Sequence, residues 1–309
     1  MKNAIIYFYN IFIDVVEKIN ERFYFSYQNR NFVIFPYPRK IEEAPYIYAL
    51  TKEMLAAGLP VYEIILTKDN NVLFMYEEKY YILMIMPNIR NRIIVYDDII
   101  NFYYIPNDRK ILEKLDKSSW STYWEQKIDY FEYQFSPLAS KYPLLAESFN
   151  FYIGLWENAV SYYNDNVGIS NVKQVCHKRV SATMDLLEFY NPLYFVIDCK
   201  VRDVGDYLKS YVLVENFSFS SIISFLRKNS YQRNNALLLL ARVLFPSYYF
   251  DLYENIIVNG VNEIRIKEVI DRTGSILELI NILFVYFSFY NIPTIDWIKK
   301  EEDYSSSEC

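Results

Sequence analysis

Residues 171–184 read NVKQVCHKRVSATM and contain His177, the single histidine of the chain. Loops of the form H-x-D-x-x-x-x-N transfer phosphoryl groups: the aspartate accepts the substrate hydroxyl proton, the asparagine binds Mg²⁺, and a later aspartate at a strand end also binds Mg²⁺. Aligned on that pattern, Arg179 has the position of the base and Met184 that of the asparagine. Asp198, in the run VID, has the position of the strand-end aspartate. The spacing of such a loop is kept, but its base and its amide are replaced.

These replacements remove the chemistry of the loop. An arginine, whose pKa is above about 12, cannot accept a proton, and a thioether is a poor ligand for a hard cation. The remaining carboxylates are Asp198, Asp203 in RDVGDYLK, and Asp185, which lies one place outside the expected register. We therefore expect a catalytically degenerate loop, with Asp198 at a vestigial metal position and Asp203 as a second cofactor-binding candidate.

The N-terminal part also lacks the groups that hold nucleotide phosphates. No glycine precedes Gly58, so no glycine-rich loop can close over phosphates. The run FVIFPYP has no lysine where the phosphate-contacting lysine of such a strand would lie. Arg39 and Lys40 follow that run and Glu53 lies on the next predicted helix, so a displaced ion pair is an alternative.

Arg179 has three interpretations: a structural cation paired with Asp198 or Asp203, a phosphate-binding group, or a solvated loop residue. The first is favoured, because an arginine beside a retained carboxylate would replace the missing metal charge.

His177 is interpreted as a packed residue that holds the loop. A zinc cluster of Cys176, His177, Asp198 and Cys199 is disfavoured, because adjacent ligands lack the Cys-x-x-Cys spacing that lets side chains converge. Without a G-x-S-x-G run, nucleophilic hydrolysis by serine is also disfavoured.

The N-terminal run MKNAIIYFYNIFIDVV predicts a first helix and no signal peptide. Asp14 interrupts the apolar run, no cleavage site of small residues follows, and Glu17, Lys18 and Glu21 continue an amphipathic pattern.

Strands dominate the next segment. Two β-rich runs joined by QNRN predict a hairpin, which Pro36 and Pro38 terminate. The run APYIYALTKEMLAAG predicts a helix that ends at Gly58. Three strands follow in VYEIILT, NVLFMY and YYILMIM.

Helices dominate after residue 87. SSWSTYWEQKIDYFEYQF predicts a helix with a buried stripe at Trp120, Trp124, Ile128, Phe131 and Phe135. PLLAESFNFYIGLWENAVSYYND predicts another, in which Glu157 and Asn158 are expected as buried caps or interlobe hydrogen-bonding groups. VKQVC and LYFVID predict two short strands. ILELINILFVYFSFY is shorter than the roughly 20 residues of a membrane span, so we expect a buried helix and no span.

Composition narrows the class further. The net charge of −6 and pI near 5.1 argue against nucleic-acid binding. Three cysteines form no disulfide framework, which favours synthesis in a reducing cytoplasm. The 32 tyrosines and 22 phenylalanines reflect either A+T-rich codons or a surface selected for tyrosine contacts or crosslinks.

The order of elements predicts an α+β, bilobal, protein-kinase-like fold of the aminoglycoside phosphotransferase and choline kinase type. Residues 1–87 form the small β-rich N-lobe, residues 88–300 the larger helical C-lobe, and residues 301–309 a disordered tail. The lobes meet near residues 86–88.

Several segments resemble the YutH branch of the spore-coat-associated kinase-like proteins of endospore-forming bacteria. They are NFYIGLWENAVSYYND, VCHKRV, FVIDCKVRDVGDYLK, ARVLFPSYYFDLYENI and WSTYWEQKIDYFEYQF. The resemblance covers about residues 20–298 and is strongest in the second lobe. It implies a phosphotransferase-like fold, synthesis in the mother cell, deposition on the spore coat and coat-protein partners. It also implies that H-x-R at Arg179 is a feature of the branch, with Arg202 and Asp203 at its Arg-Asp pair.

The residues and the resemblance together predict a catalytically inactive pseudokinase that acts as a structural or scaffolding component of the coat, without a cofactor. The alternative is an atypical phosphotransferase that uses ATP and Mg²⁺ at Asp198. A third hypothesis is a pseudoenzyme that binds nucleotide without turnover.

Overall fold

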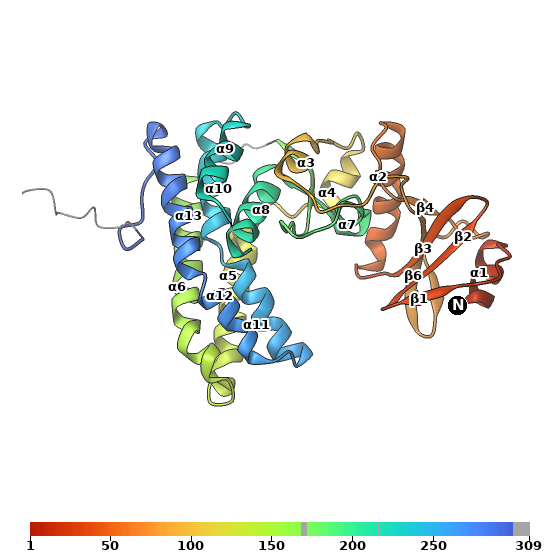
Figure 1. The fold of residues 1–309 in the computed structure, drawn as a ribbon, viewed down its shortest axis with the longest axis horizontal. Coiled ribbons are helices and arrows are strands. Elements are labelled where there is room, and N and C mark those ends of the chain that lie inside the picture. The colour runs from red at the N-terminus through yellow and green to blue at the C-terminus, as the bar shows by residue number, and fades with distance from the viewer. Residues whose placement is uncertain (168–171, 215–216, 299–309) are drawn as a thin grey trace, which may run out of the picture.

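The computed structural model describes residues 1–167, 172–214 and 217–298. In Figure 1 an antiparallel sheet lies at one end of the long axis and a set of long helices at the other. The expected bilobal α+β architecture is therefore present. The predicted tail, residues 301–309, lies outside the described residues.

The N-lobe sheet has the strand order β1-β2-β3-β6-β4, and β5 pairs with β6 on the side. The strands are β1 Glu17–Ile19, β2 Arg22–Tyr27, β3 Arg30–Pro36, β4 Glu63–Ile65, β5 Phe74–Tyr76 and β6 Lys79–Ile85. The predicted β2–β3 hairpin is confirmed. Its two turn residues, Gln28 and Asn29, both have positive φ, which is the conformation of a type I′ turn.

Both faces of this sheet are buried, because alternate residues of the central strands point to opposite sides. Phe32 and Ile34 of β3 pack on the side of α1 (Lys2–Tyr9). Val33 and Phe35 point the other way and pack with α2 (Ala44–Ala56). Figure 1 shows α2 between the sheet and the central helices.

The predicted extent of the first helix is wrong. Helix α1 ends at Tyr9, and Asn10 adopts a left-handed conformation with φ of 56°. Glu17 and Lys18, expected to continue the helix, belong to β1, which pairs with β2. Their side chains are exposed in that strand, so the polar spacing fitted either structure.

Helices build the C-lobe. They are α3 Tyr96–Asn101, α4 Arg109–Lys114, α5 Trp120–Phe135, α6 Pro143–Asn166, α7 Leu186–Phe189, α8 Val201–Leu213, α9 Phe219–Arg227, α10 Arg233–Leu244, α11 Ser247–Asn259, α12 Lys267–Ile270 and α13 Thr273–Tyr286. The predicted short strands form an antiparallel pair, β7 Lys173–His177 and β8 Phe195–Cys199. The apolar stripe predicted on α5 is buried at all of its positions.

One prediction on α6 is wrong. Glu157 is exposed, and Asn158 donates its side-chain N–H to the carbonyl of Gly154 in the same helix, at 2.7 Å. Neither residue links the lobes. The apolar residues around them on the helix are buried, and the prediction wrongly extended this burial to Glu157 and Asn158.

Residues 233–259 form the one helical run of the described residues with the length and hydropathy of a membrane span. Inside the lobe, 83% of its apolar window is buried, and Pro246 divides the run into α10 and α11. The run is therefore part of the buried interior of the C-lobe.

Candidate functional site

Asp198 lies at the end of β8, where the vestigial metal position was expected. Its carboxylate accepts hydrogen bonds from protein donors. Arg202 Nη1 lies 2.7 Å from Oδ2, and Trp120 Nε1 donates to the same oxygen at 2.8 Å. The backbone N–H of Cys199 donates to Oδ1 at 2.7 Å. Burial raises the pKa of Asp198, while these donors and the Arg202 charge oppose the rise.

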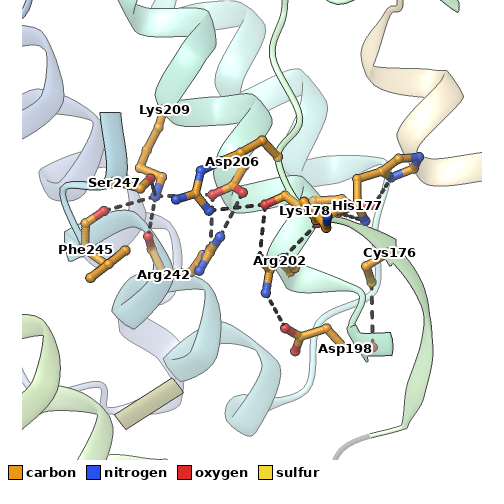
Figure 2. Close-up of polar contacts among 12 residues, drawn as sticks. Cys176, His177, Lys178, Asp198, Arg202, Asp206, Lys209, Arg242, Phe245 and Ser247 are labelled. Atoms are coloured by element: carbon orange, nitrogen blue, oxygen red, sulfur yellow. Dashed lines mark hydrogen bonds and ion pairs between the residues drawn. The ribbon is translucent and has the colours of Figure 1, made fainter. Parts of the chain in front are cut away.

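Arg202, at the start of α8, ties this carboxylate to the degenerate loop. Its Nε donates to the carbonyl of His177 at 2.8 Å, and its Nη2 donates to the carbonyl of Lys178 at 3.0 Å. Figure 2 shows the guanidinium between the loop backbone and Asp198. The guanidinium therefore places a permanent positive charge beside the carboxylate at which Mg²⁺ binding was considered.

His177 has the predicted structural role. Its backbone N–H and its Nδ1 lie 2.9 and 2.7 Å from the two carboxylate oxygens of Asp203. Nε2 lies 2.8 Å from the carbonyl of Phe189, which can only accept, so Nε2 carries a proton. The ring is fully buried and stacks on the Phe189 ring at 4.3 Å. Both carboxylate oxygens of Asp203, the second cofactor-binding candidate, are therefore engaged by His177.

The predicted partners of Arg179 are wrong. Arg179 forms a two-pronged ion pair with Asp251 of α11, with Nε and Nη2 at 2.7 and 2.9 Å from its carboxylate oxygens. Both side chains are about half exposed. Asp198 and Asp203 already have Arg202 and His177, and α11 is distant in sequence, so spacing alone gave no sign of Asp251.

Met184 and Asp185 do not form a metal site either. Met184 is half buried and packs against the core, and its carbonyl accepts the N–H of Ile94 at 2.9 Å. Asp185 caps α7, accepting the N–H of Glu188 at 2.9 Å. Asp185, which could have assisted Asp198 in the phosphotransferase alternative, thus has a local structural role.

Two arginines of the N-lobe form polar contacts with the C-lobe. Arg22 of β2 forms an ion pair with Glu188 of α7. Arg39 donates to the carbonyls of Leu193 and Phe195 at 3.1 and 2.6 Å. These contacts join β2 and the residues after β3 to α7 and to the segment that leads into β8.

The conceivable displaced ion pair with Glu53 is absent from the described residues. Arg39 pairs with Glu43 at 2.6 Å instead. Glu53 accepts from the Tyr104 hydroxyl at 3.2 Å and from the backbone N–H of Asn107 at 2.9 Å. The cation that follows β3 therefore binds the C-lobe backbone.

A second buried ionic cluster was missed by the sequence reasoning. Asp206 of α8 accepts from Nε and Nη2 of Arg242 at 3.0 and 2.8 Å. Lys209 Nζ lies 3.3 Å from Asp206 and donates to the carbonyls of Arg242 and Phe245 and to Ser247 Oγ (Figure 2). The available signal was a pair of oppositely charged residues, Asp206 and Lys209, three positions apart on one helix.

The pKa values in this cluster follow from burial and charge. Burial opposes ionisation of Asp206, but the charges of Arg242 and Lys209 hold its pKa well below the ordinary value. Burial lowers the pKa of Lys209 to about 7, although Asp206 acts in the opposite direction.

The residues of the disfavoured zinc cluster make other contacts. Cys176 Sγ lies 3.4 Å from the carbonyl of Cys199, and His177 binds Asp203 and Phe189. Burial raises the pKa of the Cys199 thiol to about 11. Within the described ranges no group of three or more histidine, cysteine, aspartate or glutamate side chains could hold a metal ion.

Comparisons with known proteins agree with this geometry at the level of family and fold. Residues 2–278 match the model of the family "Spore coat putative kinase YutH". The chain is 23% identical to the endospore coat-associated protein YutH of Bacillus subtilis (strain 168), over 89% of this chain and 91% of that protein.

The solved structures that it resembles are phosphotransferases. Spectinomycin phosphotransferase, in complex with ADP and spectinomycin, has a TM-score of 0.60 at 10% identity and is covered over 96% of its length by 92% of this chain. An aminoglycoside phosphotransferase from Alicyclobacillus acidocaldarius has a TM-score of 0.58 at 9% identity, with 94% of this chain and 96% of that one covered. At these identities the likeness shows the fold alone.

Proposed function

Because the chain belongs to the YutH family of spore coat kinase-like proteins, we propose that it is a catalytically inactive pseudokinase that acts as a structural or scaffolding component of the endospore coat. It is made in the mother-cell cytoplasm, is deposited on the coat and binds other coat proteins. The name of the Bacillus subtilis relative, an endospore coat-associated protein, supports this location.

The observation that carries the proposal is the engagement of Asp198. A phosphotransferase of this fold needs that carboxylate for Mg²⁺. Here Arg202 and Trp120 both bind its Oδ2, and the Asp198 side chain is fully buried. Removing the guanidinium would leave a buried charge unpaired, which costs about 3–5 kcal/mol. A metal ion at this carboxylate would have to compete with the Arg202 ion pair.

The loop supports the same conclusion. Arg179 cannot act as a base, and its guanidinium is held by Asp251. The two carboxylates that could help Asp198, Asp185 and Asp203, are a helix cap and a histidine partner. The side chains of the loop therefore stabilise the C-lobe.

Thermal unfolding of the purified full-length protein with ATP, with and without Mg²⁺, tests the proposal. A ligand at 100 times its Kd stabilises the native state by about 2.7 kcal/mol, which is visible as a rise in Tm. We expect no Mg²⁺-dependent rise at millimolar ATP. A Mg²⁺-dependent rise that Asp198→Asn abolishes would contradict the proposal and show nucleotide binding, and an assay of phosphate transfer would then separate the atypical phosphotransferase from a pseudoenzyme that binds nucleotide without turnover.

A further inference from the structure

A cavity of about 830 Å³ lies beside the degenerate loop. Its walls come from the start of α5, from the loop after β7 and from α11. Cavities of this size take small organic ligands. A ligand in the cavity would leave the contacts described above for Asp198, His177 and Asp203 intact.

Basic side chains outnumber acidic ones in the lining, by six to three. Four of the six are neutralised in ion pairs: Lys127 with Glu254, Arg179 with Asp251, Arg202 with Asp198, and Arg242 with Asp206. Lys117 and Lys178 have no carboxylate partner among the described residues. The lining of the cavity thus includes two lysines that form no ion pair within the described residues.

These two lysines affect each other electrostatically. Burial, the charge of Arg39 and the charge of Lys117 lower the pKa of Lys178 to about 8, against the opposing effect of Glu43. A lysine held beside like charges is stabilised when an anion binds next to it. One carboxylate would neutralise one of the two ammonium groups, whereas a phosphomonoester, with a charge near −2, would neutralise both.

The start of α5 adds to the positive potential. Ser119, its N-cap, makes no side-chain capping bond, and the first turn contains no acidic residue. Ser119 and Trp120 both line the cavity. Unsatisfied N–H groups at the start of a 16-residue helix favour an anion at that position.

We propose that this cavity binds a small organic phosphate. Its phosphate group lies between Lys117 and Lys178 at the start of α5, and its organic part lies against the exposed rings of Tyr123 and Tyr130. Binding needs neither Mg²⁺ nor a free Asp198 and involves no group transfer. The inference is therefore independent of the coat function proposed above.

Isothermal titration calorimetry of the full-length protein with phenyl phosphate, in Mg²⁺-free buffer of low ionic strength, tests the proposal. Inorganic phosphate and benzoate are the comparison ligands. We expect phenyl phosphate to bind at least tenfold more tightly than either one, and more weakly as salt is added. Equal affinity for benzoate would contradict the requirement for a dianion, and equal affinity for inorganic phosphate would contradict the role of the tyrosine rings.

Variants locate the site. Lys117→Gln combined with Lys178→Gln should weaken phenyl phosphate binding at least tenfold, whereas Lys178→Arg, which keeps the charge, should retain it. Lys110→Gln, at an exposed lysine of α4 outside the cavity, is the matched control. Circular dichroism and Tm establish that each variant is folded. A folded double variant that binds like the wild-type protein, or no binding to the wild-type protein at millimolar ligand, would overturn the proposal.

Discussion

Arg202 Nη1 lies 2.7 Å from Asp198 Oδ2, and the same guanidinium binds the carbonyls of His177 and Lys178. One side chain therefore joins the retained strand-end carboxylate to the loop that would carry out catalysis in an active phosphotransferase. The contact turns two catalytic elements into one structural unit. We therefore predict that mutations here change the stability of the protein.

Arg202→Met should lower the free energy of unfolding by about 3–5 kcal/mol, because it leaves the Asp198 carboxylate buried without its cation. Urea unfolding followed by circular dichroism measures the change. Arg109→Met is the control, because the Arg109–Glu113 pair is exposed and worth about 0–1 kcal/mol.

The double variant Arg202→Met, Asp198→Leu completes a thermodynamic cycle. It should recover part of the loss, because removing both charges leaves no unpaired group in the core. The loss of unfolding free energy in the double variant is compared with the summed losses of Arg202→Met and Asp198→Leu. If the double variant loses as much as that sum, or more, the two residues do not stabilise the fold as a pair.

Arg179→Asp should not produce phosphate transfer, although it restores the H-x-D pattern. The new carboxylate would lie near Asp251, and Asp198 would still be held by Arg202. Hydrolysis or transfer of phosphate from radiolabelled ATP measures the activity. Arg179→Ala serves as the control for loss of the half-exposed ion pair, which we expect to cost about 0–1 kcal/mol. Activity gained by Arg179→Asp alone would show that a working nucleotide site exists.

Lys209 should make stability depend on pH. Burial lowers its folded-state pKa to about 7, against 10.5 as the ordinary value. Between these values the unfolded chain binds more protons than the folded one, so stability should rise with pH above about 7 and be lower below it. Lys178, whose pKa is about 8, changes stability in the same direction.

Urea midpoints measured between about pH 6.5 and pH 8.5 test this sign, within a window that ends below the ordinary range of tyrosine ionisation. Lys209→Met should flatten the rise, whereas Lys178→Met should leave most of it. An equal slope in the wild-type protein and in Lys209→Met would remove Lys209 as the source.

Gly205→Ala should lower the stability of the protein by disturbing the packing of α8 against α10. A Cβ at this position would lie 2.8 Å from Cγ of Arg242, the residue that neutralises Asp206. We expect a loss of about 1–3 kcal/mol from overpacking. Gly154→Ala in α6 is the matched control, because an added Cβ there meets nothing within 4 Å. That control should gain about 0.5–1 kcal/mol from helix propensity, and Tm values of the two variants test the opposite signs.

Local patterns in the sequence determined most of the elements. Runs of strand-forming residues predicted β2 to β6, QNRN predicted the hairpin turn, and the apolar stripe on α5 predicted its buried face. The structural role of His177 also followed from its place in the H-x-R loop. Such features depend on neighbours a few positions away, so spacing and residue type are sufficient to predict them.

Tertiary structure decided the partners. Asp198 was recognised as a retained carboxylate, but its pairing with Arg202 and Trp120 depends on how β8, α8 and α5 pack. Arg179 was assigned to the wrong carboxylates, because Asp251 lies 72 residues further along the chain. Glu17 and Lys18 were likewise assigned to the wrong element, because they pair with β2 as part of β1. Ion pairs between distant residues form only after the hydrophobic core has brought their elements together, so sequence reveals the charges and the fold selects which of them meet.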